Sequence, residues 1–152
     1  MSNNSINNSR VKVKVKKGSK SVSSRRWLER QLNDPYVVAA KEDGYRSRSA
    51  YKLIELNDKF KFLKKSKTVI DLGAAPGGWS QVAAKIIGLP KTGKLVAVDI
   101  QDIVPIEGLS FINGSIMDEE IIEIIKKKLE CQADVVLSCL LYTSDAADEE
   151  DS

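Results

Sequence analysis

Two features of the sequence could together bind a small molecule: a glycine-rich turn at residues 71–78 and an aspartate, Asp99, further along the chain. The turn follows a short apolar run and precedes a helical pattern, which is typical of a buried strand that turns directly into a helix. Glycines at such a turn let the backbone approach a ligand that a Cβ atom would exclude. Asp99 ends a second apolar run at residues 94–99. An acid at this place accepts hydrogen bonds from both hydroxyls of a ribose, and the alternative role is a helix cap or turn former. The two features together predict a cofactor that contains adenosine.

The spacing of the turn narrows the class of cofactor. No Gly-Lys-Ser/Thr follows the glycines, so the phosphate-binding lysine of a P-loop is missing. The glycines are arranged as Gly73-x-x-x-Gly77-Gly78, whereas the dinucleotide fingerprint is Gly-x-Gly-x-x-Gly. Pro76 also lacks an N–H donor at a place where a pyrophosphate would need one. A cofactor without phosphates, such as S-adenosylmethionine, fits this turn better. A nicotinamide-dependent oxidoreductase is the weaker alternative.

The hydrophobic pattern predicts an α/β fold in which four parallel strands alternate with helices. We expect short helices at 27–32 and 35–41, with Asp34 as the N-cap of the second and Gly44 at its end. The remaining predicted helices are 49–60, 78–87 and 117–129, and the predicted strands are 67–71, 94–99, 109–113 and 133–138.

Composition excludes several classes of function. The chain has 152 residues, enough for one domain with a single core, and no apolar run has the length of a membrane span. It contains no histidine, which excludes Ser-His and Cys-His nucleophilic chemistry and any histidine-based metal site. Its two cysteines, Cys131 and Cys139, fit neither a metal-binding spacing nor a disulfide framework. We therefore expect no metal and a reducing compartment.

The charges are divided unevenly along the chain. Residues 1–67 hold 18 basic and 6 acidic side chains, whereas residues 68–152 hold 6 and 15. A basic first half predicts contact with a polyanion, which could be RNA, DNA or an anionic membrane. We favour a nucleic acid, bound partly by a disordered basic arm over residues 1–23. The alternatives are a solvated tail and an organellar transit peptide, because the first 28 residues contain no acid. The candidate contacts are Lys12, Lys14, Lys16, Lys17, Arg25, Arg26, Arg46 and Arg48.

The turn Asp71-Leu-Gly-Ala-Ala-Pro-Gly-Gly-Trp-Ser-Gln81 resembles the cofactor loop of the FtsJ family of ribosomal RNA 2′-O-methyltransferases. Segments 24–28, 34–37 and 45–53 resemble the same family in the same order, and the resemblance ends at about Ser138. It implies a class I S-adenosylmethionine-dependent methyltransferase fold, Rossmann-like and here incomplete, with helices on both faces of the sheet. It also implies methylation of a uridine ribose in large-subunit ribosomal RNA, with no DNA or membrane partner. The expected protein is monomeric and cytoplasmic, with the organellar matrix as the alternative location.

The resemblance also assigns roles to single residues. Lys52 matches the first catalytic lysine of the family, and the alternative is a surface lysine paired with Glu55. Trp79 matches a residue that flanks the cofactor, and the alternative is core packing. Ser115 stands where the family places an aspartate for the adenine amino group, so it can accept a hydrogen bond but carries no charge. The predicted cofactor-binding residues are Asp71, Gly73, Pro76, Gly77, Gly78, Trp79, Asp99 and Ser115.

The sequence departs from the family at Cys139. The family continues with Asp-Met-Ala-Pro, and this aspartate belongs to a catalytic Lys-Asp-Lys-Glu group of which only Lys52 has a match here. We expect residues 24–138 to form the N-terminal part of the methyltransferase domain and residues 139–152 to be a foreign acidic tail. The alternative is a genuine tail that shields the basic arm. The expected consequences are an uncovered sheet edge, marginal stability and no measurable methyl transfer. A non-catalytic RNA-binding protein with a residual cofactor fold is the second hypothesis.

Overall fold

The computed structural model describes residue 14 and residues 21–139 of the chain. The arm predicted over residues 1–23 and the tail predicted over 139–152 therefore lie almost entirely outside the described residues. The same holds for Lys12, Lys16 and Lys17, whose predicted contacts stay predictions.

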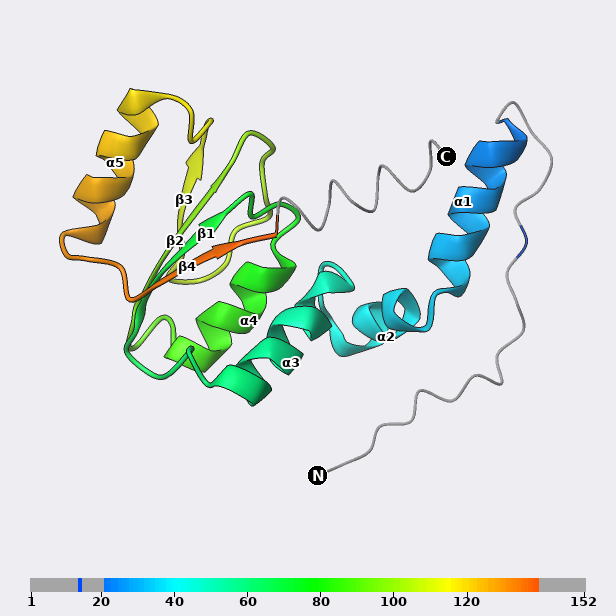
Figure 1. Ribbon diagram of the computed structural model, residues 1–152, viewed down its shortest axis with the longest axis horizontal. Coiled ribbons are helices and arrows are strands. Elements are labelled where there is room, and N and C mark those ends of the chain that lie inside the picture. The colour runs from blue at the N-terminus through cyan, green and yellow to red at the C-terminus, as the bar shows by residue number, and fades with distance from the viewer. Residues whose placement is uncertain (1–13, 15–20, 140–152) are drawn as a thin grey trace.

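The centre of the structure is a parallel sheet of four strands (Figure 1). The strands are β1 (Thr68–Leu72), β2 (Lys94–Asp99), β3 (Ser110–Asn113) and β4 (Val135–Ser138), in the spatial order β3-β2-β1-β4. Asp71 of β1 lies opposite Ala97 of β2 and Leu137 of β4. The predicted fold class is thus confirmed, and the carboxyl ends of all four strands meet at one edge. That edge carries the glycine-rich turn and Asp99.

Helices cover both faces of this sheet, as predicted. Figure 1 shows α3 (Ser49–Phe60) and α4 (Gly78–Ile87) on one face and α5 (Glu119–Leu129) on the other. Successive strand residues point to opposite faces, so the two faces build separate clusters of buried side chains. The first cluster includes Leu53, Val69, Ile87 and Leu95. The second cluster consists of Val96, Val98, Ile112, Ile125 and Leu129.

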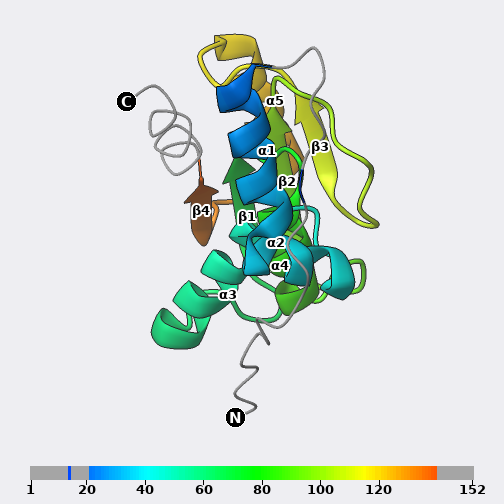
Figure 2. The same cartoon turned by 90° about the vertical axis from the view of Figure 1, so that its right-hand side faces the viewer.

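Two further helices precede α3. The first, α1 (Val22–Asn33), packs against α2 (Pro35–Asp43), and both lie in front of the sheet when the molecule is turned by 90° (Figure 2). The predictions for α2 are confirmed at both ends. The Asp34 carboxylate accepts hydrogen bonds from the backbone of Tyr36 and Val37, and Gly44 ends the helix with a φ of 80°. Such a left-handed conformation suits glycine, which has no Cβ atom.

The prediction for α1 was wrong at its start. The helix begins at Val22 and not at residue 27, because the Ser21 hydroxyl caps it by accepting a hydrogen bond from the backbone N–H of Ser24 at 3.2 Å. The last residues of the predicted disordered arm therefore belong to a helix. The other boundaries agree with the prediction, or differ from it by one or two residues, at every strand and helix of the sheet domain.

Candidate functional site

The glycine-rich turn joins β1 to α4 and is attached to the end of the neighbouring strand. The backbone N–H groups of Gly73 and Ala74 donate to the carbonyl oxygen of Val98 at 2.8 and 3.1 Å. Gly73 has a φ of 71°, a conformation that suits a residue without a Cβ atom. The turn is therefore fixed relative to β2, the strand that ends in Asp99.

Asp99 shapes the two loops on either side of it. Its Oδ2 accepts a hydrogen bond from the backbone N–H of Ala75 at 2.8 Å, and its Oδ1 accepts one from Gln101 at 2.9 Å. The turn-forming role that the sequence left open is thus present in the structure. Each carboxylate oxygen can accept more than one hydrogen bond, so Asp99 keeps acceptor capacity for hydroxyl groups. Its contact with a ribose stays a prediction.

Asp71 is a buried carboxylate with one unsatisfied oxygen. The residue is 0% exposed, and its Oδ2 accepts a hydrogen bond from the Ser80 hydroxyl at 2.6 Å. Its Oδ1 has no hydrogen-bond partner among the described residues, which is unusual for a buried polar atom. Burial raises the pKa of Asp71 to about 6, the Ser80 hydrogen bond acts against this shift, and the charge of Asp99 adds to it. This oxygen is a natural acceptor for a donor group on a ligand.

Gly77 and Gly78 lie against two side chains that the sequence did not place beside them. A Cβ atom built on Gly78 would lie 2.2 Å from the Ser47 hydroxyl, and one built on Gly77 would lie 2.9 Å from Nη1 of Arg46. The space beside both glycines is thus occupied by the segment between α2 and α3. The missing Cβ atoms of these two glycines thus leave room for the chain itself, and the contact of their backbone with a cofactor stays a prediction.

We expect Gly78→Ala to lower the free energy of unfolding by about 1–3 kcal/mol, because the new methyl group would overlap the Ser47 hydroxyl. Urea denaturation measures the effect, and Ser47→Gly in the same chain should restore most of it. Gly44→Ala is the control. Gly44 has a positive φ but nothing within 4 Å of the added atom. Gly44→Ala should therefore lower the free energy of unfolding by about 1 kcal/mol, and Ser47→Gly should not change this loss. Equal rescue of both alanine variants would contradict the proposed overlap.

Trp79 and Ser115 occupy different settings at this edge. Trp79 is 8% exposed, belongs to the first core cluster and donates its indole N–H to the carbonyl oxygen of Ser49 at 2.7 Å. The core-packing alternative is therefore what the structure shows, and a cofactor contact of Trp79 stays a prediction. Ser115 is half-buried just after β3, and its hydroxyl accepts a hydrogen bond from the backbone N–H of Met117 at 3.1 Å. Because Asn113 lies opposite Asp99, Ser115 reaches the same edge of the sheet.

Lys52 lies on α3 with its side chain exposed. The structure pairs it neither with Glu55 nor with any other carboxylate among the described residues. The surface ion pair that was its structural alternative is thus not observed. Its catalytic role is neither supported nor contradicted by this geometry and stays a prediction.

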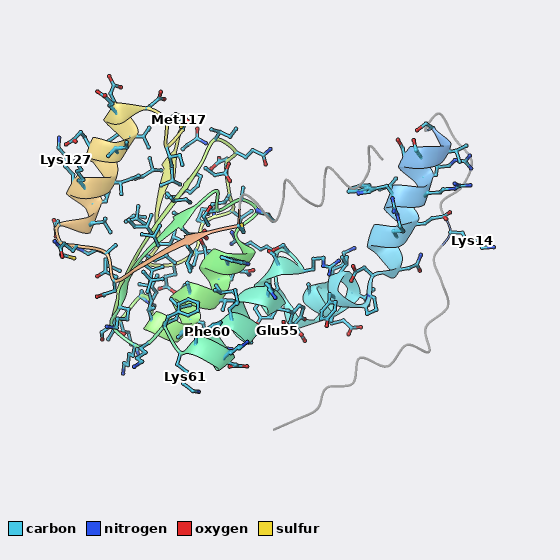
Figure 3. The ribbon with its side chains drawn as sticks, viewed as in Figure 1. Lys14, Glu55, Phe60, Lys61, Met117 and Lys127 are labelled. Carbon is cyan, nitrogen blue, oxygen red and sulfur yellow. The ribbon has the colours of Figure 1, made fainter. Side chains whose placement is uncertain are left out.

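The candidate RNA contacts divide into exposed and internally bonded side chains. Lys14 and Arg26 are exposed, and Lys14 lies toward the end of the molecule that carries α1 (Figure 3). Arg25 is half-buried, and its Nε has no hydrogen-bond partner among the described residues. Arg48 instead pairs with Asp34, and its guanidinium stacks on the Tyr36 ring at 5.5 Å from the ring centroid. Arg46 is also bonded within the protein, to the backbone carbonyl oxygens of Pro76, Val104 and Pro105.

Two residues of the site were missed by sequence reasoning. Ser80 holds Asp71, and Gln81 bonds both the backbone N–H of Arg46 at 2.7 Å and the carbonyl oxygen of Gly44 at 3.1 Å. Both residues are polar and lie in the first turn of α4, a helix that otherwise packs on the sheet. This position was the one feature of the sequence that could have indicated a role in the site. The sequence alone could not name their partners.

Comparison with known proteins adds a decisive match at this point. A family model described as FtsJ-like methyltransferase matches residues 45–147, more than half of the chain. The chain belongs to the FtsJ-like methyltransferase family. The match includes α3, the glycine-rich turn, Asp99 and all four strands, and it extends past Cys139.

Several relatives of this FtsJ-like chain carry the description ribosomal RNA large subunit methyltransferase E. The relative from Nitrobacter hamburgensis is 53% identical over 131 residues, which is 85% of this chain and 58% of that protein. The relative from Brucella ovis is 48% identical over 132 residues, which is 86% of this chain and 55% of that protein. The chain thus spans about half the length of the curated relatives it matches.

A solved structure agrees with the fold. The crystal structure described as a ribosomal RNA methyltransferase from Plasmodium falciparum is 37% identical, with a TM-score of 0.53. The likeness covers 62% of this FtsJ-like chain and 55% of that one.

S-adenosylmethionine is the cofactor of this FtsJ-like domain, as the sequence predicts. The carboxyl edge of the sheet fits such a group. Asp99 has acceptor capacity for hydroxyls, and Asp71 has an unsatisfied buried oxygen. Helix α4 begins after Gly77 with no side-chain cap, so its first N–H groups suit a carboxylate. The assignment of each contact stays a prediction.

Cys139 follows β4 at the same edge of the FtsJ-like domain. It is 9% exposed, and its thiol lies 3.6 Å from the carbonyl oxygen of Gly73, within the cofactor turn.

Within the part of the chain that the structure describes, no group of three or more acidic or cysteine side chains could hold a metal ion. Over the same residues, no helix combines the length and apolar character needed to cross a bilayer.

Proposed function

We propose that this domain serves the transfer of a methyl group from S-adenosylmethionine to the 2′-oxygen of a uridine ribose in large-subunit ribosomal RNA. The proposal is supported above all by identity of about one half, over 131 residues, to relatives described as ribosomal RNA large subunit methyltransferase E. The family membership and the cofactor give the reaction class. The 2′-hydroxyl and the uridine come from the resemblance of residues 45–53 and 71–81 to the FtsJ enzymes.

The residues of this chain have separate tasks in the proposed reaction. The cofactor supplies an electrophilic methyl group on a positively charged sulfur. The turn after β1 and Asp99 would hold it at the carboxyl edge of the sheet, beside Cys139. Lys52 would act on the RNA hydroxyl, whose proton must be removed or shared before the oxygen becomes a good nucleophile. That hydroxyl is present in RNA and absent from DNA, which restricts the substrate class.

We further propose that transfer by this chain is slow, because a thiol stands where the resemblance expects an orienting carboxylate. The Cys139 thiol is buried beside the carbonyl oxygen of Gly73. A carboxylate there could hold the lysine ammonium or the RNA hydroxyl in place, whereas an uncharged thiol cannot. This observation also favours the second candidate function, a non-catalytic RNA-binding protein that retains the cofactor fold.

A labelling experiment separates these functions. The protein is titrated with S-adenosylmethionine in a calorimeter and then incubated with large-subunit ribosomal RNA and cofactor that carries a tritiated methyl group. We expect binding at one site and little label, and the label should resist alkaline cleavage at uridine, because a 2′-O-methyl group blocks that cleavage. Label in a base would contradict the proposed position. The absence of binding heat at millimolar cofactor would contradict the proposal as a whole, and a normal rate of labelling would contradict the role given to Cys139.

A further inference from the structure

Arg46 links two loops that are far apart in the sequence. It lies between α2 and α3, and its guanidinium bonds backbone carbonyl groups on both loops. Nη1 donates to Val104 and, at 3.5 Å, to Pro76, and Nη2 donates to Pro105 at 3.2 Å. Pro76 belongs to the cofactor turn, whereas Val104 and Pro105 belong to the loop that follows Asp99.

The position of Arg46 is fixed at the other end of the residue as well. Its backbone N–H donates to the Gln81 side chain at 2.7 Å, and the amide of the same side chain donates to the carbonyl oxygen of Gly44 at 3.1 Å. The guanidinium also lies directly against Gly77, where a Cβ atom would come within 2.9 Å of Nη1. The side chain is thus held by α4 and by the turn while it reaches the second loop.

The second loop is anchored near its two ends: Ile106 and Leu109 pack against the first core cluster, and the Gln101 backbone N–H donates to Asp99. Residues 100–109 form no helix or strand, and Ile100 and Val104 are 73% and 71% exposed. Ile103 is the buried residue of this stretch, at 8% exposed. The middle of the loop, at Val104 and Pro105, is exposed, and a segment with few buried contacts opens at little cost in free energy. The bonds from Arg46 act on this middle part and hold it near the turn.

Arginine suits this task better than lysine does. Its planar group has five N–H donors in a fixed arrangement, so one side chain can bond several carbonyl oxygens in different directions. The ammonium group of lysine is a point charge on a flexible stem, and it could satisfy one loop but not hold both. The head group that the sequence assigned to RNA phosphates is therefore already in use inside the protein.

We propose that Arg46 is a positioning residue for the cofactor site: it ties the turn after β1 to the loop after β2 and so sets the affinity for S-adenosylmethionine. RNA phosphates are not its partner. The inference rests on the proposed function insofar as the cofactor binds between these two loops. It goes beyond that function by giving a residue outside both loops control over the site.

The first test measures cofactor affinity in the whole chain. Arg46→Ala should weaken binding of S-adenosylmethionine at least about tenfold, which corresponds to about 1.4 kcal/mol. Arg46→Lys should recover only part of the loss, because it can reach one loop. Arg30→Ala is the matched control, since it removes an exposed arginine of α1 and should change cofactor affinity less than about twofold. Binding of ribosomal RNA should fall equally and slightly in Arg46→Ala and Arg30→Ala, as expected for the loss of one positive charge.

The second test needs no ligand. Amide hydrogen exchange in Arg46→Ala should rise at least about threefold in residues 100–107 and 73–78, with the core of α4 unchanged. Unchanged exchange in both loops would overturn the proposal, whether or not the cofactor binds. So would normal cofactor affinity combined with a specific loss of RNA binding, or a uniform loss of stability in Arg46→Ala. The parent protein could bind no cofactor while hydrogen exchange in both loops still rose in Arg46→Ala. In that case the role of Arg46 in holding the two loops together would be supported, and only the proposed function would be contradicted.

Discussion

Asp99→Ala is expected to weaken the binding of S-adenosylmethionine by at least about 100-fold. A hydrogen bond to a charged group contributes about 1.5–3 kcal/mol, and two ribose hydroxyls would each lose such a bond. The substitution also removes the acceptors of the Ala75 and Gln101 backbone N–H groups, so the turn and the next loop lose a shared anchor. Calorimetric titration of the purified protein measures the dissociation constant directly.

The matched control for this experiment is Asp102→Ala. Asp102 is an exposed carboxylate of the loop that follows Asp99, and its Oδ1 accepts a hydrogen bond from the neighbouring Ile103 backbone N–H at 2.9 Å. Its removal changes the net charge by the same amount and should leave cofactor affinity within about twofold. Thermal unfolding without ligand separates a weakened fold from a weakened site. Equal affinities in Asp99→Ala and the parent protein would remove Asp99 from the cofactor site.

The second large effect is a dependence of stability on pH that comes from Asp71. Burial raises the pKa of this carboxyl from 3.8 to about 6, so the folded protein holds its proton more tightly than the unfolded chain does. The stabilisation is complete below about pH 4 and is lost as the pH rises through about 6. A shift of this size corresponds to about 3 kcal/mol in the free energy of unfolding. Stability should therefore decrease from pH 4 to pH 7 through this group.

Two variants isolate this contribution of Asp71. Asp71→Asn cannot titrate, so the difference in unfolding free energy between it and the parent protein should change across this pH range. Ser80→Ala removes the hydrogen bond that favours the charged carboxylate, so it should move the transition to higher pH. Urea denaturation at half-unit pH intervals gives the three curves. Parallel curves for Asp71→Asn and the parent protein would show that the carboxyl does not titrate in this range.

The sequence predicted those parts of the fold that local signals determine. Helices α3 and α4 and strand β2 have the predicted boundaries, because each has a strong hydrophobic pattern, and glycines flank α4 at both ends. Helix α1 was predicted too short because its N-cap, Ser21, lies in a stretch of serine and basic residues that is typical of a disordered arm. Serine also favours the N-cap position of helices, and at Ser21 this second role decides where α1 begins.

The candidate site was harder to predict because its contacts join distant segments. The glycine pattern and the acid at the end of β2 identified the cofactor edge, and the family match confirms that class of cofactor. No local pattern shows that Ser47 and Arg46 fill the space beside the glycines, since thirty residues separate the two segments. Nor does a pattern show that burial leaves one oxygen of Asp71 unsatisfied. These features depend on packing across the fold.

The contact between Ser47 and Gly78 has a consequence for how such proteins can diverge. A side chain at position 78 requires a smaller residue at position 47, because a Cβ atom on residue 78 would lie only 2.2 Å from the Ser47 hydroxyl oxygen and the two atoms would overlap. Neutral drift at either position is therefore constrained by the other, and the pair should covary among homologues. The residues that must change together with the glycine motif therefore include Ser47, which lies before α3 and well before the first glycine of the turn.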